Sequence, residues 1–185
     1  MNNPLPQRRT IRLQGYDYSQ EGLYFVTICC QDKICRFGKI QNDEVVLNEV
    51  GEIVKRYWLD IPNHFPHIIL HEFVIMPNHV HGILEIAECV AVAANNHSPE
   101  NETPFRSPSK TIGSVVRGFK IGVSKWLNNQ WAKDFSPVRQ LSKSIWQRNY
   151  YEHIIRNSRS YQNISDYIKS NPINWIQDDY YSELE

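Results

Sequence analysis

The chain alternates between short apolar runs and polar breaks, and the spacing of the apolar positions predicts where strands and helices lie. The apolar, β-branched and aromatic run from Gly22 to Cys30 predicts a central strand. A second extended stretch is expected from about Arg36 to Leu47, with a turn at Gln41-Asn42-Asp43. Two more strands are expected at about His67 to Met76 and His79 to Ala87.

Apolar residues at three- and four-residue spacing predict helices elsewhere in the chain. The first helix follows Asn48, a suitable N-cap, and stops at Pro62. A second helix is expected at about Ile112 to Asn128, and a third at about Arg159 to Ser170, before a proline. The aromatic stretch from Ser144 to Ile155 is expected to be extended in part.

This order of elements predicts an α+β fold of the ferredoxin-like kind, with helices packed on an antiparallel sheet. We expect one domain over residues 21–176, preceded by an N-terminal arm over residues 1–20. Residues 89–110 have no hydrophobic period and are expected to form a flexible excursion within that domain. Residues 177–185 form an acidic tail that is expected to fray.

Composition argues for a soluble protein of the bacterial cytoplasm, associated with the nucleoid. No run of about 18 apolar residues is present, so no membrane helix is expected. Residues 1–15 are polar and basic, without the apolar core of a secretory signal. The four cysteines have neither zinc-site spacing nor a disulfide pattern, which favours reduced thiols.

The net charge is zero, yet the charge is unevenly distributed. Residues 105–160 carry eleven Lys and Arg against two acids, whereas the remainder carries nine bases and eighteen acids. Aromatic residues are interleaved with the bases, as in surfaces that bind single-stranded nucleic acid. On charge and placement, the candidate DNA contacts are Arg117, Lys120, Arg148 and Arg156, although a solvated basic face would look the same.

The segment Met-Pro-Asn-His-Val-His-Gly contains the strongest candidate for chemistry. In a strand, residues two apart face the same side, so His79 and His81 can converge on one divalent ion. Such a pair also occurs by chance on strand surfaces. A structural zinc site is disfavoured because no cysteine or third histidine lies at short spacing.

The third predicted helix offers partners for these histidines. Tyr167 and Asn171 are four residues apart and share a helix face. The Asn171 amide oxygen can complete a His-His-Asn ligand set, which suits Mg²⁺ or Mn²⁺, while the Tyr167 phenol attacks a phosphate. The alternative is that Tyr167 packs on the sheet and Asn171 caps the helix before Pro172. Tyr150, Tyr151 and Tyr161 have no metal ligand at the same spacing.

Four segments, FVTICC, VIMPNHVHGIL, IGSVVRGFK and IWQRNYYEHIIRNSRSYQNISDYIKSNPINW, follow one another from about Gly22 to Trp175. In this combination the chain resembles the single-tyrosine HUH transposases of the smallest insertion sequences, and most closely the REP-associated tyrosine transposases. The resemblance implies that His79 and His81 bind the metal, that Tyr167 is the nucleophile and that Asn171 is the third ligand. It further implies cleavage of single-stranded DNA near a hairpin through a 5′-phosphotyrosine link. The excursion over residues 89–110 is longer than is usual for this family.

Two other functions remain open. The chain could be a hairpin-binding module in which the histidine pair is structural, or a metal-dependent hydrolase that uses water as the nucleophile. The sequence leaves open which hairpin is bound and whether the protein acts as a monomer or a homodimer.

Overall fold

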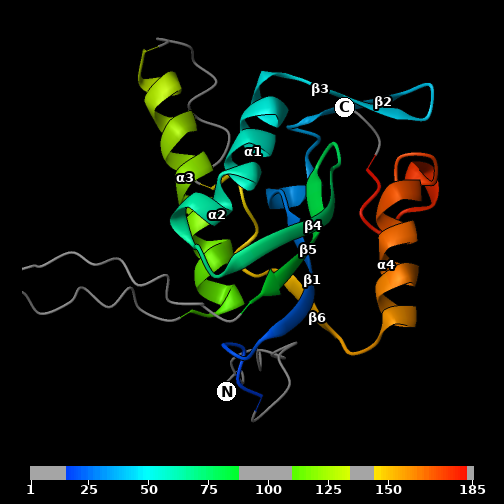
Figure 1. Ribbon diagram of the computed structural model, residues 1–185. Helices are drawn as coiled ribbons and strands as arrows, with labels where there is room; N and C mark the ends of the chain where they lie inside the picture. The colour runs from blue at the N-terminus through cyan, green and yellow to red at the C-terminus, as the bar shows by residue number, and fades with distance from the viewer. Residues whose placement is uncertain (1–15, 88–109, 134–143, 183–185) are drawn as a thin grey trace, which may run out of the picture.

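The computed structural model describes residues 16–87, 110–133 and 144–182, and of residues 131–133 only the backbone. Residues 1–15 of the predicted arm and residues 89–109 of the predicted excursion lie outside the described residues. The described elements follow the predicted order (Figure 1). They are β1 (Gly22–Cys29), β2 (Gly38–Gln41), β3 (Glu44–Leu47), α1 (Glu49–Leu59), α2 (Ile61–His64), β4 (Ile68–Ile75), β5 (His79–Ile86), α3 (Ile112–Lys133), β6 (Tyr151–Ile155) and α4 (Ser158–Ser170).

The main sheet has the strand order β4-β5-β1-β6, and every pair of neighbours is antiparallel. Together with α1 and α3, these strands form the β-α-β-β-α-β sequence of a ferredoxin-like fold. The predicted fold class is therefore confirmed. The hairpin of β2 and β3 forms a separate two-stranded sheet, and its turn residues Asn42 and Asp43 both have positive φ, as a tight two-residue hairpin turn requires.

Local capping interactions define where the helices begin. The Asn48 side chain accepts a hydrogen bond from the Gly51 amide at 3.0 Å at the start of α1, as the sequence predicted. Asn157 does the same for α4 by accepting from the Ser160 amide at 2.8 Å. Pro62 does not end the helical region but lies in the first turn of the short α2, where its missing N–H is tolerated. None of the described helices combines the length and the apolar character needed to span a membrane.

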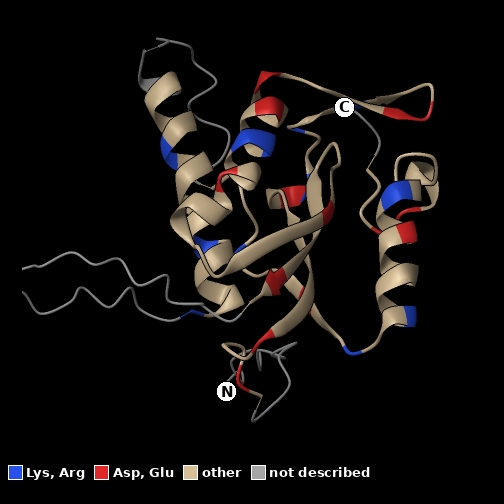
Figure 2. Cartoon of the chain, in the orientation of Figure 1, with Lys and Arg blue, Asp and Glu red and all other residues tan. Residues whose placement is uncertain are grey.

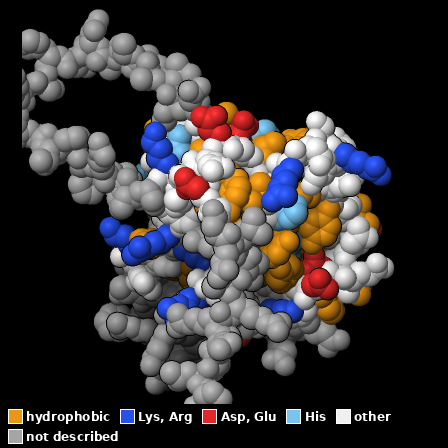
Figure 3. Space-filling model, turned by 90° about the horizontal axis from the view of Figure 1, so that it is seen from below, with side chains coloured by type: hydrophobic (Ala, Val, Ile, Leu, Met, Phe, Trp, Pro, Cys, Tyr) orange, Lys and Arg blue, Asp and Glu red, His pale blue; other side chains and the backbone are white. Residues whose placement is uncertain are grey.

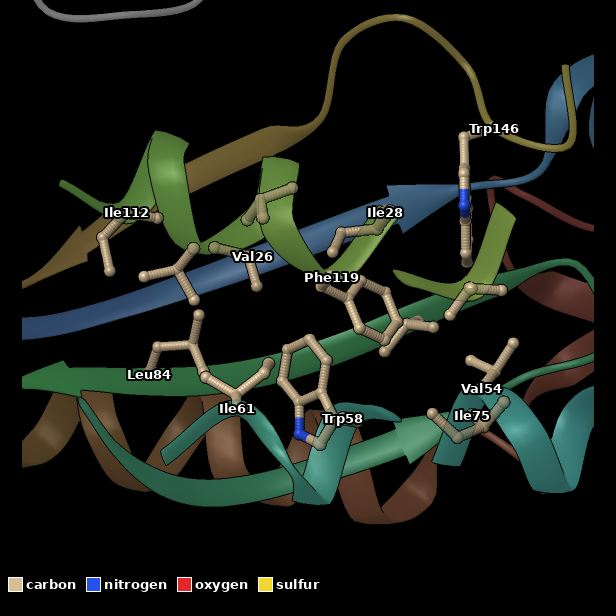
Figure 4. Close-up of a cluster of buried hydrophobic side chains, with 14 of the residues drawn as sticks. Val26, Ile28, Val54, Trp58, Ile61, Ile75, Leu84, Ile112, Phe119 and Trp146 are labelled. Carbon is tan, nitrogen blue, oxygen red and sulfur yellow. The ribbon is translucent and has the colours of Figure 1, made fainter. Parts of the chain in front are cut away.

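The two faces of the sheet pack against different helices. α1, α2 and α3 cover one face, and α4 lies on the other (Figure 1). Alternate residues of the central strands, such as Val26, Ile28 and Leu84, point into the main core, where they pack with Trp58 and Phe119 (Figure 4). The residues between them face α4. There a smaller cluster is formed by Phe25, Ile83, Ile155 and Ile168.

Gly82 lies at a point of close approach in the main core. A Cβ added there would lie 2.3 Å from Cζ2 and 2.9 Å from Cη2 of Trp58. Gly82→Ala is therefore expected to lower the free energy of unfolding by about 1–3 kcal/mol through overpacking, as measured by denaturant titration. Trp58→Phe removes the two clashing atoms, so the cost of Gly82→Ala should shrink in that background; equal costs in both backgrounds would contradict this explanation.

Candidate metal and tyrosine site

A tight turn places the two histidines at the start of β5. The Met76 amide donates to the His79 carbonyl at 2.8 Å, so that Pro77 and Asn78 form the turn between β4 and β5. Side chains alternate between the two faces of β5. Val80 lies in the main core, so His79 and His81 on either side of it face α4. Both imidazoles are almost fully buried, and their ring centroids are 4.3 Å apart.

Asn78 fixes which nitrogen of His79 carries the proton. The Asn78 amide nitrogen donates to the carbonyl oxygens of Lys33 and Tyr180, both at 2.8 Å, and these atoms can only accept. The Asn78 amide oxygen therefore faces His79 Nδ1 at 2.8 Å and accepts its hydrogen. This leaves Nε2 of His79 unprotonated, buried and without a hydrogen-bond partner among the described residues. Such an imidazole is oriented as metal ligands are.

His81 is held from both sides. Its Nδ1 lies 2.8 Å from Thr27 Oγ1 on β1, and its Nε2 lies 3.2 Å from the Tyr167 hydroxyl on α4. The Phe25 ring stacks on the imidazole with centroids 5.4 Å apart. Burial lowers the pKa of His79 to about 3, against a smaller opposing contribution from Asn171, and lowers the pKa of His81 well below its usual value. Both rings are therefore neutral and can act as ligands at neutral pH.

α4 brings Tyr167 and Asn171 to the histidines, as their four-residue spacing predicted. Asn171 is the C-cap of α4, is 2% exposed and lies against His79. Its amide nitrogen donates to Asp178 at 2.7 Å, and its amide oxygen is buried without a partner among the described residues. Two atoms with unused lone pairs, His79 Nε2 and Asn171 Oδ1, therefore belong to one site. Both roles considered for Asn171, cap and ligand, are compatible with this geometry.

Asp178 is the main functional candidate that the sequence did not single out. Ligand atoms of His79, His81 and Asp178 all lie within 4.8 Å of one another, so these three residues could hold a metal ion. Two neutral imidazoles, a carboxylate and an amide oxygen suit a divalent cation such as Mg²⁺ or Mn²⁺. The only sequence signal was an acidic residue shortly after the predicted third helix.

The expectation that the acidic tail frays is wrong for residues 178–182. The Asp178 carboxylate also accepts from the Tyr180 amide at 2.6 Å, and the Tyr180 ring lies 4.9 Å from the His79 ring. Ser182 donates to the Lys33 carbonyl at 2.7 Å. These hydrogen bonds and the ring contact attach the tail to the site, and composition alone gave no sign of them.

The Tyr167 phenol lies at the border of the site. Its side chain is 43% exposed, and its hydroxyl reaches both His81 Nε2 and, at 3.4 Å, Asp178 Oδ2. Partial burial and the nearby Asp178 carboxylate raise the pKa of Tyr167 far above its usual value. The phenol is thus protonated at neutral pH and must lose its proton to an acceptor before it can attack. Tyr167 and the two histidines thus meet within this one chain.

The four predicted DNA contacts do not line one cavity. Lys120 and Arg148 line a groove of about 660 Å³ beside α3, and Arg117 is exposed on that helix. Arg156 lines a different cavity at the start of α4, and Lys and Arg residues occur in elements on both sides of the sheet (Figure 2). Lys120 donates to the carbonyl oxygens of residues 147 and 149, and burial lowers its pKa to about 8. Lys120 thus anchors the segment before β6.

Comparisons with known proteins agree with this fold. No family model matches the chain. An uncharacterized protein of Haemophilus influenzae is 48% identical over 182 residues, which cover 97% of this chain and 96% of that protein. A second Haemophilus influenzae protein, provisionally assigned as a REP-associated tyrosine transposase, is 24% identical and covers 85% of this chain and 73% of its own length.

A solved structure of a REP-associated tyrosine transposase bound to a REP hairpin aligns with a TM-score of 0.52. The two chains are 19% identical, and the alignment covers 92% of this chain and 74% of the other. The fold is thus that of a tyrosine transposase, and the predicted resemblance to the REP-associated group is confirmed. The chain belongs to one family with the uncharacterized Haemophilus influenzae protein.

The role of Asn78 can be measured through metal binding. Asn78→Ala removes the acceptor that holds the hydrogen on His79 Nδ1, so Mn²⁺ affinity is expected to fall by roughly 10- to 100-fold. Calorimetric titration of the protein with Mn²⁺ gives this affinity, and circular dichroism checks that the fold is kept. Asn63→Ala, at an exposed residue on α2, is the matched control and should leave the affinity unchanged. Equal affinities for Asn78→Ala and the control would contradict the assignment.

Proposed function

We propose that the protein is a metal-dependent single-strand DNA endonuclease and strand transferase that recognises hairpin DNA and cleaves through a 5′-phosphotyrosine intermediate. The single observation that carries the proposal is the position of the Tyr167 hydroxyl, 3.2 Å from Nε2 of a buried neutral His81 and beside the His79, His81 and Asp178 group. A transposase-like activity is also supported by the relation to REP-associated tyrosine transposases.

The donor set of the site fits a divalent cation. His79 Nε2 and Asn171 Oδ1 are buried atoms with unused lone pairs, and His81 and Asp178 lie next to them. These four residues would hold Mg²⁺ or Mn²⁺. When bound, the cation would polarise the scissile phosphate and stabilise the departing 3′ oxygen. Asn78 and Thr27 would orient the imidazoles from behind through their hydrogen bonds to the two Nδ1 atoms.

In the proposed reaction the Tyr167 oxygen bonds to phosphorus while the bond from phosphorus to the 3′ oxygen breaks. Because His81 Nε2 is the nitrogen assigned to the cation, the phenol proton passes to Asp178 Oδ2, and the leaving 3′ oxygen takes up a proton from solvent. The covalent link keeps the phosphodiester energy, so a 3′-hydroxyl of another strand can attack it and restore a DNA backbone without ATP. The partial exposure of Tyr167 leaves room for a DNA strand beside the ring.

Hairpin DNA is the proposed partner because the related transposase was solved with a REP hairpin. Arg117, Lys120, Arg148 and Arg156 remain the predicted DNA contacts, and the groove that Lys120 and Arg148 line is one candidate for the duplex part. Homodimerisation remains a prediction. The second candidate function is a hairpin-binding module without cleavage. The contacts of residues 178–182 favour it, because this segment lies over the histidines.

Tyr167→Phe is expected to abolish covalent attachment while leaving hairpin binding unchanged, because only the attacking oxygen is lost. The protein is incubated with a labelled hairpin oligonucleotide that carries single-stranded arms, in the presence of Mg²⁺ or Mn²⁺, and adducts are scored on a denaturing gel. Tyr151→Phe is the matched control, because it removes the hydroxyl of another exposed tyrosine near Phe25 but keeps the ring, and it should keep the adduct.

The other outcomes separate the alternatives. Cleavage without an adduct would support a water nucleophile, and tight binding without cleavage in any metal would support the binding module. An adduct that persists in Tyr167→Phe would refute the assignment of the nucleophile.

His79→Ala or His81→Ala is expected to remove cleavage with little change in hairpin affinity, because phosphate and base contacts supply most of the binding energy. Gel shift and cleavage are measured on the same preparations. His64→Ala, at an exposed histidine on α2, serves as the control. A parallel loss of binding and cleavage in the site variants would argue against the metal-site assignment.

A further inference from the structure

α4 leaves the outer edge of its face of the sheet uncovered. The helix packs mainly on β4 and β5, and on the edge strand β6 His153 is exposed and Tyr151 is 39% exposed. Their partners on β1 are buried: Phe25, paired with His153, is 8% exposed, and Thr27, paired with Tyr151, is 1% exposed. We call these four residues the shelf.

The shelf begins beside the proposed nucleophile. The Phe25 ring meets the rings of Tyr167 and Tyr151 edge-on, each at a centroid distance of 6.2 Å. A single strand whose phosphate lies at Tyr167 could therefore continue over exposed rings. Aromatic side chains on an open sheet face are the usual platform for unpaired bases.

The shelf ends at a cavity of about 470 Å³ between β1, β6 and the start of α4. Its lining includes Leu23, His71, Glu85, Ile155, Arg156 and Tyr161. Figure 3 looks onto this end of the molecule, where basic side chains and a histidine lie among hydrophobic ones. The cavity is lined by neither histidine of the metal group nor by Tyr167.

A hydrogen-bonded chain organises the polar side of this cavity. His71 Nε2 lies 2.7 Å from Glu85 Oε2, and His71 Nδ1 lies 3.2 Å from the Tyr161 hydroxyl. Glu85 Oε1 has no hydrogen-bond partner, and Arg156 no ion pair, among the residues that the structure describes. The cavity therefore combines apolar walls, two rings, an available carboxylate oxygen and a guanidinium group.

These groups match the parts of a nucleotide. A carboxylate accepts hydrogen bonds from the exocyclic amino group of a base such as cytosine, and an arginine binds phosphate. Leu23 and Ile155 supply the apolar contact that the flat base faces need. Thymine lacks an exocyclic amino group and offers only its ring N3–H as a donor, so it can pair with the carboxylate less well.

The cavity lies within a few nucleotides of Tyr167. From the Thr27–Tyr151 pair to the Leu23–Ile155 pair the sheet advances four residues, or about 13 Å. That length corresponds to about four nucleotides at the 3.4 Å spacing of B-form DNA, and to fewer in an extended strand.

We propose that this cavity binds one amino-bearing base of the single-stranded DNA near the cleavage site, with Glu85 reading the amino group and Arg156 holding the phosphate. The intervening bases lie on Tyr151 and His153 of the shelf. The proposal rests on the proposed function, because it takes Tyr167 as the point where the strand is cut. It gives the protein sequence recognition in the single strand, separate from recognition of the hairpin.

The test combines changes in the DNA with changes in the protein. An abasic site is moved one position at a time through the single-stranded arms of a hairpin oligonucleotide, and affinity is measured by fluorescence anisotropy. At one position, within about four nucleotides of the cut, loss of the base should weaken binding to the unmodified protein by roughly 5- to 100-fold. In Tyr161→Ala, loss of the base at that position should no longer weaken binding. If no position has a selective effect, the proposal is overturned.

Glu85→Gln tests the reading of the base. The glutamine amide can donate to the O4 carbonyl of thymine, so the preference for an amino-bearing base over thymine at that position should shrink or reverse. Glu72→Gln is the matched control. Like the His71–Tyr161 contact, Glu72 links β4 to α4, through Lys169 at 3.5 Å, but it lies outside the cavity. If Glu85→Gln weakens all oligonucleotides equally, the His71 network only holds α4 in place and the proposal fails.

The two proposals fail separately. Selective base dependence with no covalent adduct would leave the cavity assignment standing and remove the nuclease. An adduct that forms at equal rates whatever the arm sequence would leave the nuclease standing and remove the cavity assignment.

Discussion

The candidate site depends on one packing constraint, the antiparallel course of α4 along β5. Residues two apart on β5 face α4 at steps of about 6.6 Å, and residues four apart on α4 advance by about 6 Å. Asn171 therefore meets His79, Tyr167 meets His81, and Tyr161 meets the His71–Glu85 pair at the other end. A shift of α4 by one turn would break all of these contacts together.

Burial gives the histidine pair its chemistry. Two imidazoles, each at most 1% exposed, cannot easily take up protons. Nδ1 of each ring is engaged, by Asn78 in His79 and by Thr27 in His81, and the Asn78 amide oxygen leaves Nε2 of His79 as a buried lone-pair donor. The cost of burying that unused lone pair is offset when an ion fills the gap, and at His81 the Tyr167 hydroxyl lies against Nε2.

The sequence was informative where function follows local spacing. The fold class follows from apolar periodicity, and the pairs His79–His81 and Tyr167–Asn171 could be selected because each pair shares a face of one element. Asp178 could not be found in this way, because it lies in a polar segment without periodicity and reaches Asn171 only through tertiary packing. Charge counts have a similar limit. They cannot distinguish a lysine on an open surface from Lys120, whose ammonium group binds two carbonyl oxygens.

The partly covered sheet face explains how, in the proposed function, a buried donor set could act on a polymer. A strand of DNA cannot enter a closed cavity, so the ligand atoms and the attacking atom have to lie at the boundary between a covered and an open region. α4 forms that boundary. Asn171, at 2% exposure, points inward under the helix, whereas Tyr167, at 43%, stands at its edge beside Phe25. Had α4 packed centrally on the sheet, it would have covered the exposed side chains of β6 as well. In the proposed function, its offset toward β4 and β5 therefore determines where the phosphate can be reached and leaves the edge strand β6 free to guide the DNA.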